Sequence, residues 1–128
     1  TIFEGDIYMK LEDAKILIGD DSILAEKVKG FGGKHFFEAA NGQEAIEKFK
    51  AEKPDIVFLD IVMPQKDGIS AVSEICRIDP DAYIIIVSSV GTQTQLRNAI
   101  EAGARDFIQK PLNTDQIKSI LSVKFEGR

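Results

Sequence analysis

Four short apolar runs of this chain each end in polar residues that could take part in chemistry. The runs cover residues 15–19, 56–59, 83–87 and 107–109, and the polar residues that end them are Asp20 with Asp21, Asp60, Ser88 and Lys110. If the runs are parallel strands of one sheet, these groups converge on its carboxyl edge, where ligands bind in open α/β sheets. The pattern therefore predicts a functional site at that edge.

The chemistry available to such a set is phosphoryl transfer. Three neighbouring carboxylates repel one another and take up protons unless cations compensate their charge. Mg²⁺ suits a site that combines a few carboxylates with water and phosphate. With this cation and the ammonium of Lys110 nearby, one carboxylate can attack phosphorus as a nucleophile, while Ser88 donates a hydrogen bond to a phosphoryl oxygen. In-line positioning and charge neutralisation would supply most of the catalysis.

The elements that must position these residues alternate between strand and helix, which favours an α/β fold with a parallel sheet. Ile56–Leu59 and Ile84–Val87 are continuously apolar, as is typical of strands covered by helices on both faces. A further short strand is expected at His35–Ala39. Right-handed crossovers would then place every strand's C-terminal end at the same edge.

Five helices are expected to follow the five strands. The first is capped by Asp21 or Ser22 and has only about two turns, which is marginal for covering a sheet face. Either Phe31, Phe36 and Phe37 complete the core beneath it, or this region is rearranged or partly mobile. The second begins at Asn41, whose spacing to Glu44 indicates a capping box. The apolar positions that repeat at helical spacing in the last three helices are Ile69, Val72, Ile75 and Cys76, then Leu96, Ala99 and Ile100, then Ile117, Ile120 and Leu121.

Length and composition fit one ordinary globular domain of 128 residues, with 44% hydrophobic and 29% charged residues. The net charge of -5 argues against a nucleic-acid or anionic membrane surface. The apolar stretches are far shorter than the roughly 20 residues that span a bilayer, and we find no signal-peptide pattern. The single cysteine, Cys76, fits a reducing compartment. A cytoplasmic protein is therefore expected.

Beyond these patterns, a set of motifs resembles the response-regulator receiver domain of two-component systems, from about Ala14 to Val123. The motifs occur in the family's order and spacing, and they are Asp20–Asp21, Phe58–Pro64, Asp67–Gly68, Ser88, Gly103–Ala104 and Lys110–Pro111. The resemblance implies a flavodoxin-like (CheY-like) doubly wound five-stranded parallel sheet with strand order 2-1-3-4-5. It also implies a phosphorylation-dependent signalling switch that catalyses only its own phosphorylation and slow dephosphorylation.

The resemblance assigns roles to individual residues. Asp60 would be the phosphoacceptor for a sensor histidine kinase or phosphotransfer protein. Mg²⁺ would be held by Asp60, by Asp21 directly and by Asp20 largely through water, with the backbone carbonyl of Val62 as a further ligand. Lys110 would pair with the phosphoryl group.

The switch itself would use Ser88 and Phe107, the latter at the family's rotating aromatic position. Because Phe107 has no hydroxyl, it is expected to favour the buried position in both states. The signal would pass to a protein partner through the face made by the fourth helix, last strand and last helix. A flagellar motor component in chemotaxis, a phosphorelay protein or a kinase would fit. The alternatives are a phosphorelay intermediate or the excised receiver of a DNA-binding regulator.

Two other interpretations are weaker. An aspartyl-phosphate phosphatase of the haloacid dehalogenase type needs a second aspartate two residues after the nucleophile, where this chain has Val62. A degenerate receiver that binds partners without phosphate is disfavoured, because all the charged site residues are present. We expect the receiver domain to span residues 14–128. Residues 1–13 form an N-terminal extension. Either Met9 is the native start and residues 1–8 remain from cloning, or the apolar residues Ile2, Phe3, Ile7 and Tyr8 form an ordered arm that packs on this or another subunit.

Overall fold

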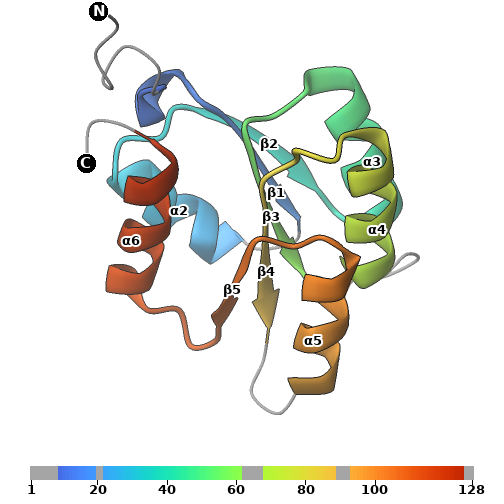
Figure 1. The fold of residues 1–128 in the computed structure, drawn as a ribbon. Helices are drawn as coiled ribbons and strands as arrows, with labels where there is room; N and C mark the ends of the chain where they lie inside the picture. Colours follow the sequence, from blue (N-terminus) through green and yellow to red (C-terminus); the bar gives the residue numbers. More distant parts are fainter. Residues whose placement is uncertain (1–8, 20–21, 62–67, 89–92, 126–128) are drawn as a thin grey trace, which may run out of the picture.

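The computed structural model describes residues 9–19, 22–61, 68–88 and 93–125. Within these ranges one parallel sheet has the strand order β2-β1-β3-β4-β5, and five α-helices alternate with its strands (Figure 1). The fold predicted from the sequence is therefore confirmed. The strands are β1 (Lys15–Gly19), β2 (His35–Ala39), β3 (Ile56–Asp60), β4 (Ile84–Ser88) and β5 (Asp106–Gln109); the α-helices are α2 (Ser22–Gly30), α3 (Gly42–Glu52), α4 (Gly68–Ile78), α5 (Gln93–Ala102) and α6 (Thr114–Lys124), after a 3₁₀ turn, η1 (Leu11–Asp13).

The sheet separates two helical layers. In Figure 1, α2 and α6 cover one face, and α3, α4 and α5 cover the other. Alternate residues of β3 supply the two cores, with Ile56 and Phe58 facing α2 and α6, and Val57 and Leu59 facing the other layer. All four side chains are buried, which explains why this strand is continuously apolar. No helix in the described ranges is long and apolar enough to cross a bilayer.

The first helix is short, as expected, with nine residues. Leu24, Ala25 and Val28 carry its buried face. Phe31, in the turn after the helix, and Phe36, in β2, pack against the same core and extend it. Phe37 points to the opposite face and packs on the α3–α5 side. The short helix is thus supplemented by two of the three phenylalanines that the sequence suggested.

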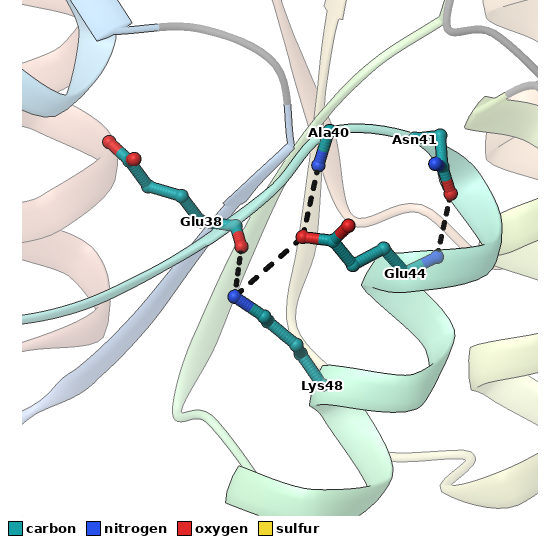
Figure 2. A network of polar contacts seen from close by, with 5 residues as sticks. All are labelled: Glu38, Ala40, Asn41, Glu44 and Lys48. Atoms are coloured by element: carbon teal, nitrogen blue, oxygen red, sulfur yellow. Dashed lines mark hydrogen bonds and ion pairs between the residues drawn. The ribbon is translucent and has the colours of Figure 1, made fainter.

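The second helix, α3, is tied to the end of the edge strand β2 by a network of polar contacts (Figure 2). Asn41 Oδ1 accepts a hydrogen bond from the backbone N–H of Glu44 at 2.8 Å, as the capping box predicts. The carboxylate of Glu44 accepts from the N–H of Ala40 at 3.4 Å, one residue before the cap. Lys48 Nζ lies 3.7 Å from Glu44 Oε1 and also donates to the carbonyl of Glu38 in β2.

The apolar face of α5 is narrower than its sequence pattern suggested. Ala99 is buried and Leu96 is partly buried, but Ile100 is 43% exposed. The helix packs against α4 and β4, so its far flank faces solvent. Gly103 follows the helix at a φ of +125°, as expected for a C′ residue, and a Cβ there would lie 3.2 Å from the Cβ of Cys76.

Candidate functional site

Parallel pairing brings together the carboxyl ends of the strands, where the polar residues lie. Gly19 at the end of β1 pairs with Leu59 of β3, and Asp60 pairs with Val87 of β4. Ser88 pairs with Gln109, the last residue of β5. Asp60, Ser88 and Lys110 therefore meet at one edge, as the strand pattern predicted. Asp20, Asp21 and Val62, the other predicted site residues, lie outside the described residues.

An ion pair joins two of the predicted site residues. Lys110 Nζ donates a hydrogen bond to Asp60 Oδ2 at 2.9 Å, across 50 positions of sequence. The Asp60 side chain is 14% exposed and that of Lys110 is 38% exposed, so the pair sits at the surface end of the sheet. A charge-assisted hydrogen bond of this length is stronger than a neutral one. The arrangement presents a carboxylate beside a fixed positive charge.

The third member of the site is Ser88, which is 1% exposed. Its hydroxyl is buried, and within the described part of the chain it has no hydrogen-bond partner. Its backbone carbonyl accepts from the N–H of Lys110 at 2.7 Å, so the end of β4 and the residue bearing the ammonium are directly joined. Buried hydroxyls are nearly always paired, so the Ser88 hydroxyl, beside an aspartate and a lysine, calls for an explanation.

The backbone around Asp60 is held by a close approach from α4. The N–H of Gly68 donates to the carbonyl of Ile61 at 2.9 Å, and the N–H of Ile61 donates to Val87 in β4 at 3.0 Å. A Cβ on Gly68 would lie 2.8 Å from Ile61 Cα and would overlap the carbonyl oxygen of Asp60. In the sequence, Gly68 is part of the Asp67–Gly68 motif, but the steric reason for a glycine appears only in the structure.

Two other residues that the sequence singled out, Phe107 and Cys76, pack against the same core. Phe107, predicted as part of the switch, is partly buried and packs on the core shared with α3, α4 and α5. Cys76 packs beside the same core and lies outside the site. Burial raises the pKa of its thiol, partly offset by the charge of Arg105. This placement agrees with a packing role for the cysteine.

The donor set fits a hard divalent cation in its chemistry. Asp60 provides a carboxylate at the sheet edge. β1 ends beside β3, at the residue directly before Asp20 and Asp21 in the sequence. Carboxylate and carbonyl oxygens are the ligands that Mg²⁺ prefers. No cluster of three acidic, histidine or cysteine side chains occurs among the described residues, which omit both of these aspartates.

Sequence reasoning missed one polar contact near the site. Gln116 of α6 donates from Nε2 to the carbonyl of Phe107 in β5 at 3.0 Å. The spacing of Gln116 from the cap residue Asn113 was a usable signal, because it repeats the pattern of Asn41 and Glu44. That pattern predicts a helix start, and it does not predict a bond to a strand.

Comparison with known proteins agrees with this geometry. The model of the response regulator receiver domain matches residues 16–122. The chemotaxis protein CheY of Thermotoga maritima is 43% identical over 113 residues, covering 84% of this chain and 94% of that protein. CheY of Bacillus subtilis is 44% identical over 108 residues, covering 80% and 90%.

Solved structures give the same result. The CheX–CheY–BeF3–Mg complex of Borrelia burgdorferi matches with a TM-score of 0.78 and 35% identity, covering 86% of this chain and 88% of the matched chain. The receiver domain of NtrX from Brucella abortus matches with a TM-score of 0.79 and 26% identity, covering 89% and 100%. With both the sequence motifs and the fold in agreement, this chain belongs to the response regulator receiver domain family.

Proposed function

We propose that this receiver, a phosphorylation-dependent switch of two-component signalling, accepts its phosphoryl group on Asp60 from a sensor histidine kinase or a phosphotransfer protein. The observation that carries the proposal is the Asp60–Lys110 ion pair at 2.9 Å beside the buried hydroxyl of Ser88, which has no hydrogen-bond partner among the residues that the structure describes. A structural ion pair alone would not need a buried hydroxyl with an unused donor next to it. A phosphoryl group on Asp60 would supply the missing acceptor.

The proposed transfer exchanges one bond to phosphorus for another. The Asp60 carboxylate oxygen forms a bond to phosphorus while the bond from phosphorus to the donor's imidazole nitrogen breaks, and the imidazole leaves. Lys110 stabilises the negative charge on the phosphoryl oxygens, and Ser88 donates its O–H to one of them. Slow hydrolysis of the acyl phosphate would then return the domain to its resting state. The chain would act on no other substrate.

Receiver domains bind Mg²⁺ generally, and here the ligands would be Asp60, Asp21, Asp20 through water, and the carbonyl of Val62. Bound Mg²⁺ supplies positive charge that neutralises phosphoryl oxygens during transfer. Lys110 contributes the protein's own share of that charge. Its ammonium already lies within hydrogen-bond distance of the carboxylate that would react.

We propose that the signal leaves through the face made by α5, β5 and α6. This face includes Ile100, an exposed apolar side chain, and Phe107, which lies next to the site edge and packs on the core. A protein partner in chemotaxis is the preferred reading, because the relatives at 43% and 44% identity are chemotaxis proteins. A phosphorelay partner, or a DNA-binding domain in a longer protein, remains the alternative. A cytoplasmic location belongs to the same proposal, in keeping with the unpaired Cys76 thiol.

The test is incubation with Mg²⁺ and acetyl phosphate, followed by intact-mass measurement. We expect a mass increase of one phosphate that hydroxylamine removes, and that is absent from Asp60→Asn. Asp81→Asn is the matched control, because Asp81 is an exposed aspartate in the turn before β4, at the opposite end of that strand from Ser88. A phosphorylated Asp60→Asn protein, or a wild-type chain that takes up no phosphate, would refute the assignment.

A further inference from the structure

The side chain of Gln116 departs from what its position in the helix predicts. Asn113 caps α6 by accepting from the N–H groups of Asp115 at 2.8 Å and Gln116 at 3.1 Å. Gln116 is therefore the third helical residue, from which a Glu or Gln normally reaches back to the N–H of the cap. Instead, its Nε2 donates across to the carbonyl of Phe107 at 3.0 Å, in a partly buried position.

At the other capping box of the chain, the third helical residue does reach back toward the start of its helix, to the residue just before the cap. Glu44, the third helical residue of α3, uses its carboxylate as an acceptor for the N–H of Ala40. The two helices thus begin with the same spacing, Asn-x-x-Glu and Asn-x-x-Gln. Only the amide carries a donor, and only the amide is used to hold a strand. A glutamate at position 116 could cap the helix but could not donate to Phe107.

The strand that Gln116 holds is the edge strand β5, which is next to β4 alone in the strand order. Edge strands expose backbone polar groups that need other partners. Phe107 has both of its groups bonded to side chains: its N–H donates to Asp106 Oδ1 at 2.8 Å, and its carbonyl accepts from Gln116. The Gln116 bond therefore fixes the outer edge of β5 three residues before Lys110.

The geometry places Lys110 inside a short loop that is closed at both ends. On one side, the Phe107 carbonyl is bonded to Gln116. On the other side, Asn113 caps the backbone N–H of the same Gln116. Within the loop, the N–H of Lys110 donates to Ser88. The ammonium of a lysine is attached through four flexible carbons. Its contact with Asp60 therefore depends on how firmly the backbone of Lys110 is held in place.

We propose that Gln116 is a positioning residue for the Asp60–Lys110 pair, acting by clamping the end of β5 to the first turn of α6. This inference rests on the proposed function, because it assigns the pair to phosphoryl transfer. The side chain of Gln116 bonds to the backbone of Phe107, so it would act on the pair only through β5. It determines where the backbone of Lys110 is held, and so how well the ammonium meets the carboxylate and the incoming phosphoryl group.

Three substitutions at position 116 distinguish the effect of losing the hydrogen-bond donor from the effects of changing side-chain size or charge. Gln116→Met removes the donor without adding charge, and Gln116→Glu removes it while retaining the side-chain shape. Gln116→Lys keeps a donor on a side chain of similar reach. Glu44→Gln is the matched control, because it alters the other capping box away from Lys110. Each protein is phosphorylated with Mg²⁺ and acetyl phosphate, and the carbonyl ¹³C shift of Phe107 reports the hydrogen bond directly.

We expect Gln116→Met and Gln116→Glu to slow phosphorylation about three- to tenfold, the range that one hydrogen bond's net contribution allows. Gln116→Lys and Glu44→Gln are expected to stay within about twofold of the wild type. The Phe107 carbonyl signal should move in the Met and Glu variants. Wild-type rates in these two variants despite a moved signal would overturn the proposal, and so would a Lys variant as slow as the Met variant.

A second measurement keeps the inference independent of phosphate uptake. Competitive acetylation with acetic anhydride, read by mass spectrometry, compares Lys110 with the exposed Lys50. We expect Lys110 to become more reactive in Gln116→Met and Gln116→Glu, because its ammonium is less firmly held against Asp60. Unchanged labelling would overturn the positioning role. If the wild-type chain takes up no phosphate, the proposed function fails, while the labelling still decides the role of Gln116.

Discussion

Gly68 offers a sharp test of how the backbone of α4 holds the phosphoacceptor in place. Its N–H donates to Ile61, and a Cβ built on it would lie 2.8 Å from Ile61 Cα and 3.1 Å from the carbonyl carbon of Asp60. Ordinary contacts between carbon atoms are about 3.5–4.0 Å. The neighbouring atoms are backbone, so they cannot turn aside as a flexible side chain would. Gly68→Ala must therefore push the chain at Asp60 by several tenths of an ångström.

Two effects of opposite sign decide the change in stability. Replacing a glycine by alanine at a position whose backbone suits both stabilises a protein by about 0.4–1 kcal/mol, because the unfolded chain loses conformational entropy. Overpacking of a filled site costs about 1–3 kcal/mol. The backbone overlap places Gly68→Ala toward the upper part of that range, so we expect a net loss of about 1–2 kcal/mol. For a domain of this size, that corresponds to a Tm lower by about 4–8 °C.

Gly30→Ala is the matched control. Gly30 is the last residue of α2, and a Cβ there would have nothing within 4 Å. The entropic gain then stands without a steric cost, and we expect stability to be unchanged or to rise by up to about 1 kcal/mol. Urea unfolding of the two variants beside the wild type measures both changes, and comparing them isolates the contact with Asp60.

The functional readout is phosphorylation by acetyl phosphate under conditions where Gly68→Ala stays folded. Small displacements of reacting groups are expensive, with about 1 Å worth roughly a hundredfold in rate. A shift of several tenths of an ångström at Asp60 should thus slow phosphorylation about tenfold. Gly30→Ala should react at the wild-type rate. The reasoning is wrong if Gly68→Ala has the unfolding free energy and the phosphorylation rate of the wild type. It is also wrong if the two variants lose stability equally.

Two other predictions follow from buried groups. Ser88→Ala removes a buried hydroxyl that has no partner among the described residues, so its urea-unfolding free energy should rise by about 1 kcal/mol while phosphorylation slows; a loss of stability would contradict this account. Burial raises the pKa of the Cys76 thiol, which lowers the thiolate fraction at any given pH. The pH midpoint of its alkylation by iodoacetamide should therefore lie above that of the urea-unfolded chain, and equal midpoints would show that the thiol is solvated in the folded state.

The sequence was sufficient to predict the sheet because its strands are apolar runs that end abruptly. Once these runs are parallel, Asp60, Ser88 and Lys110 must meet, and the register confirms this. The alternation of strand and helix predicted helices on both faces of the sheet, because strands that are apolar throughout need cover on both sides. The exposure of Ile100 could not be read from its spacing, because periodicity marks an apolar face without saying how much of it a neighbouring element will cover.

The contacts around the site were harder to predict, because they depend on choices between partners that are close in energy. Asn113 with Gln116 predicts a helix start, but the glutamine amide can serve either the cap or a strand carbonyl nearby. Only the placement of β5 beside α6 decides in favour of Phe107. Gly68 raises the same difficulty, because a glycine at the start of a helix says nothing of its neighbours, whereas its closeness to Asp60 depends on how α4 is docked.

The two edges of the sheet are managed in the same physical way, and this links stability to the site. At one edge, Lys48 of α3 donates to the carbonyl of Glu38, near the end of β2 (Figure 2). At the other edge, Gln116 of α6 donates to the carbonyl of Phe107 in β5. Each helix thereby supplies a donor to an edge strand. Asp60 and Ser88 end strands that lie between these two edges. Of the two ties, the one on β5 bears on the site, because β5 leads directly into Lys110.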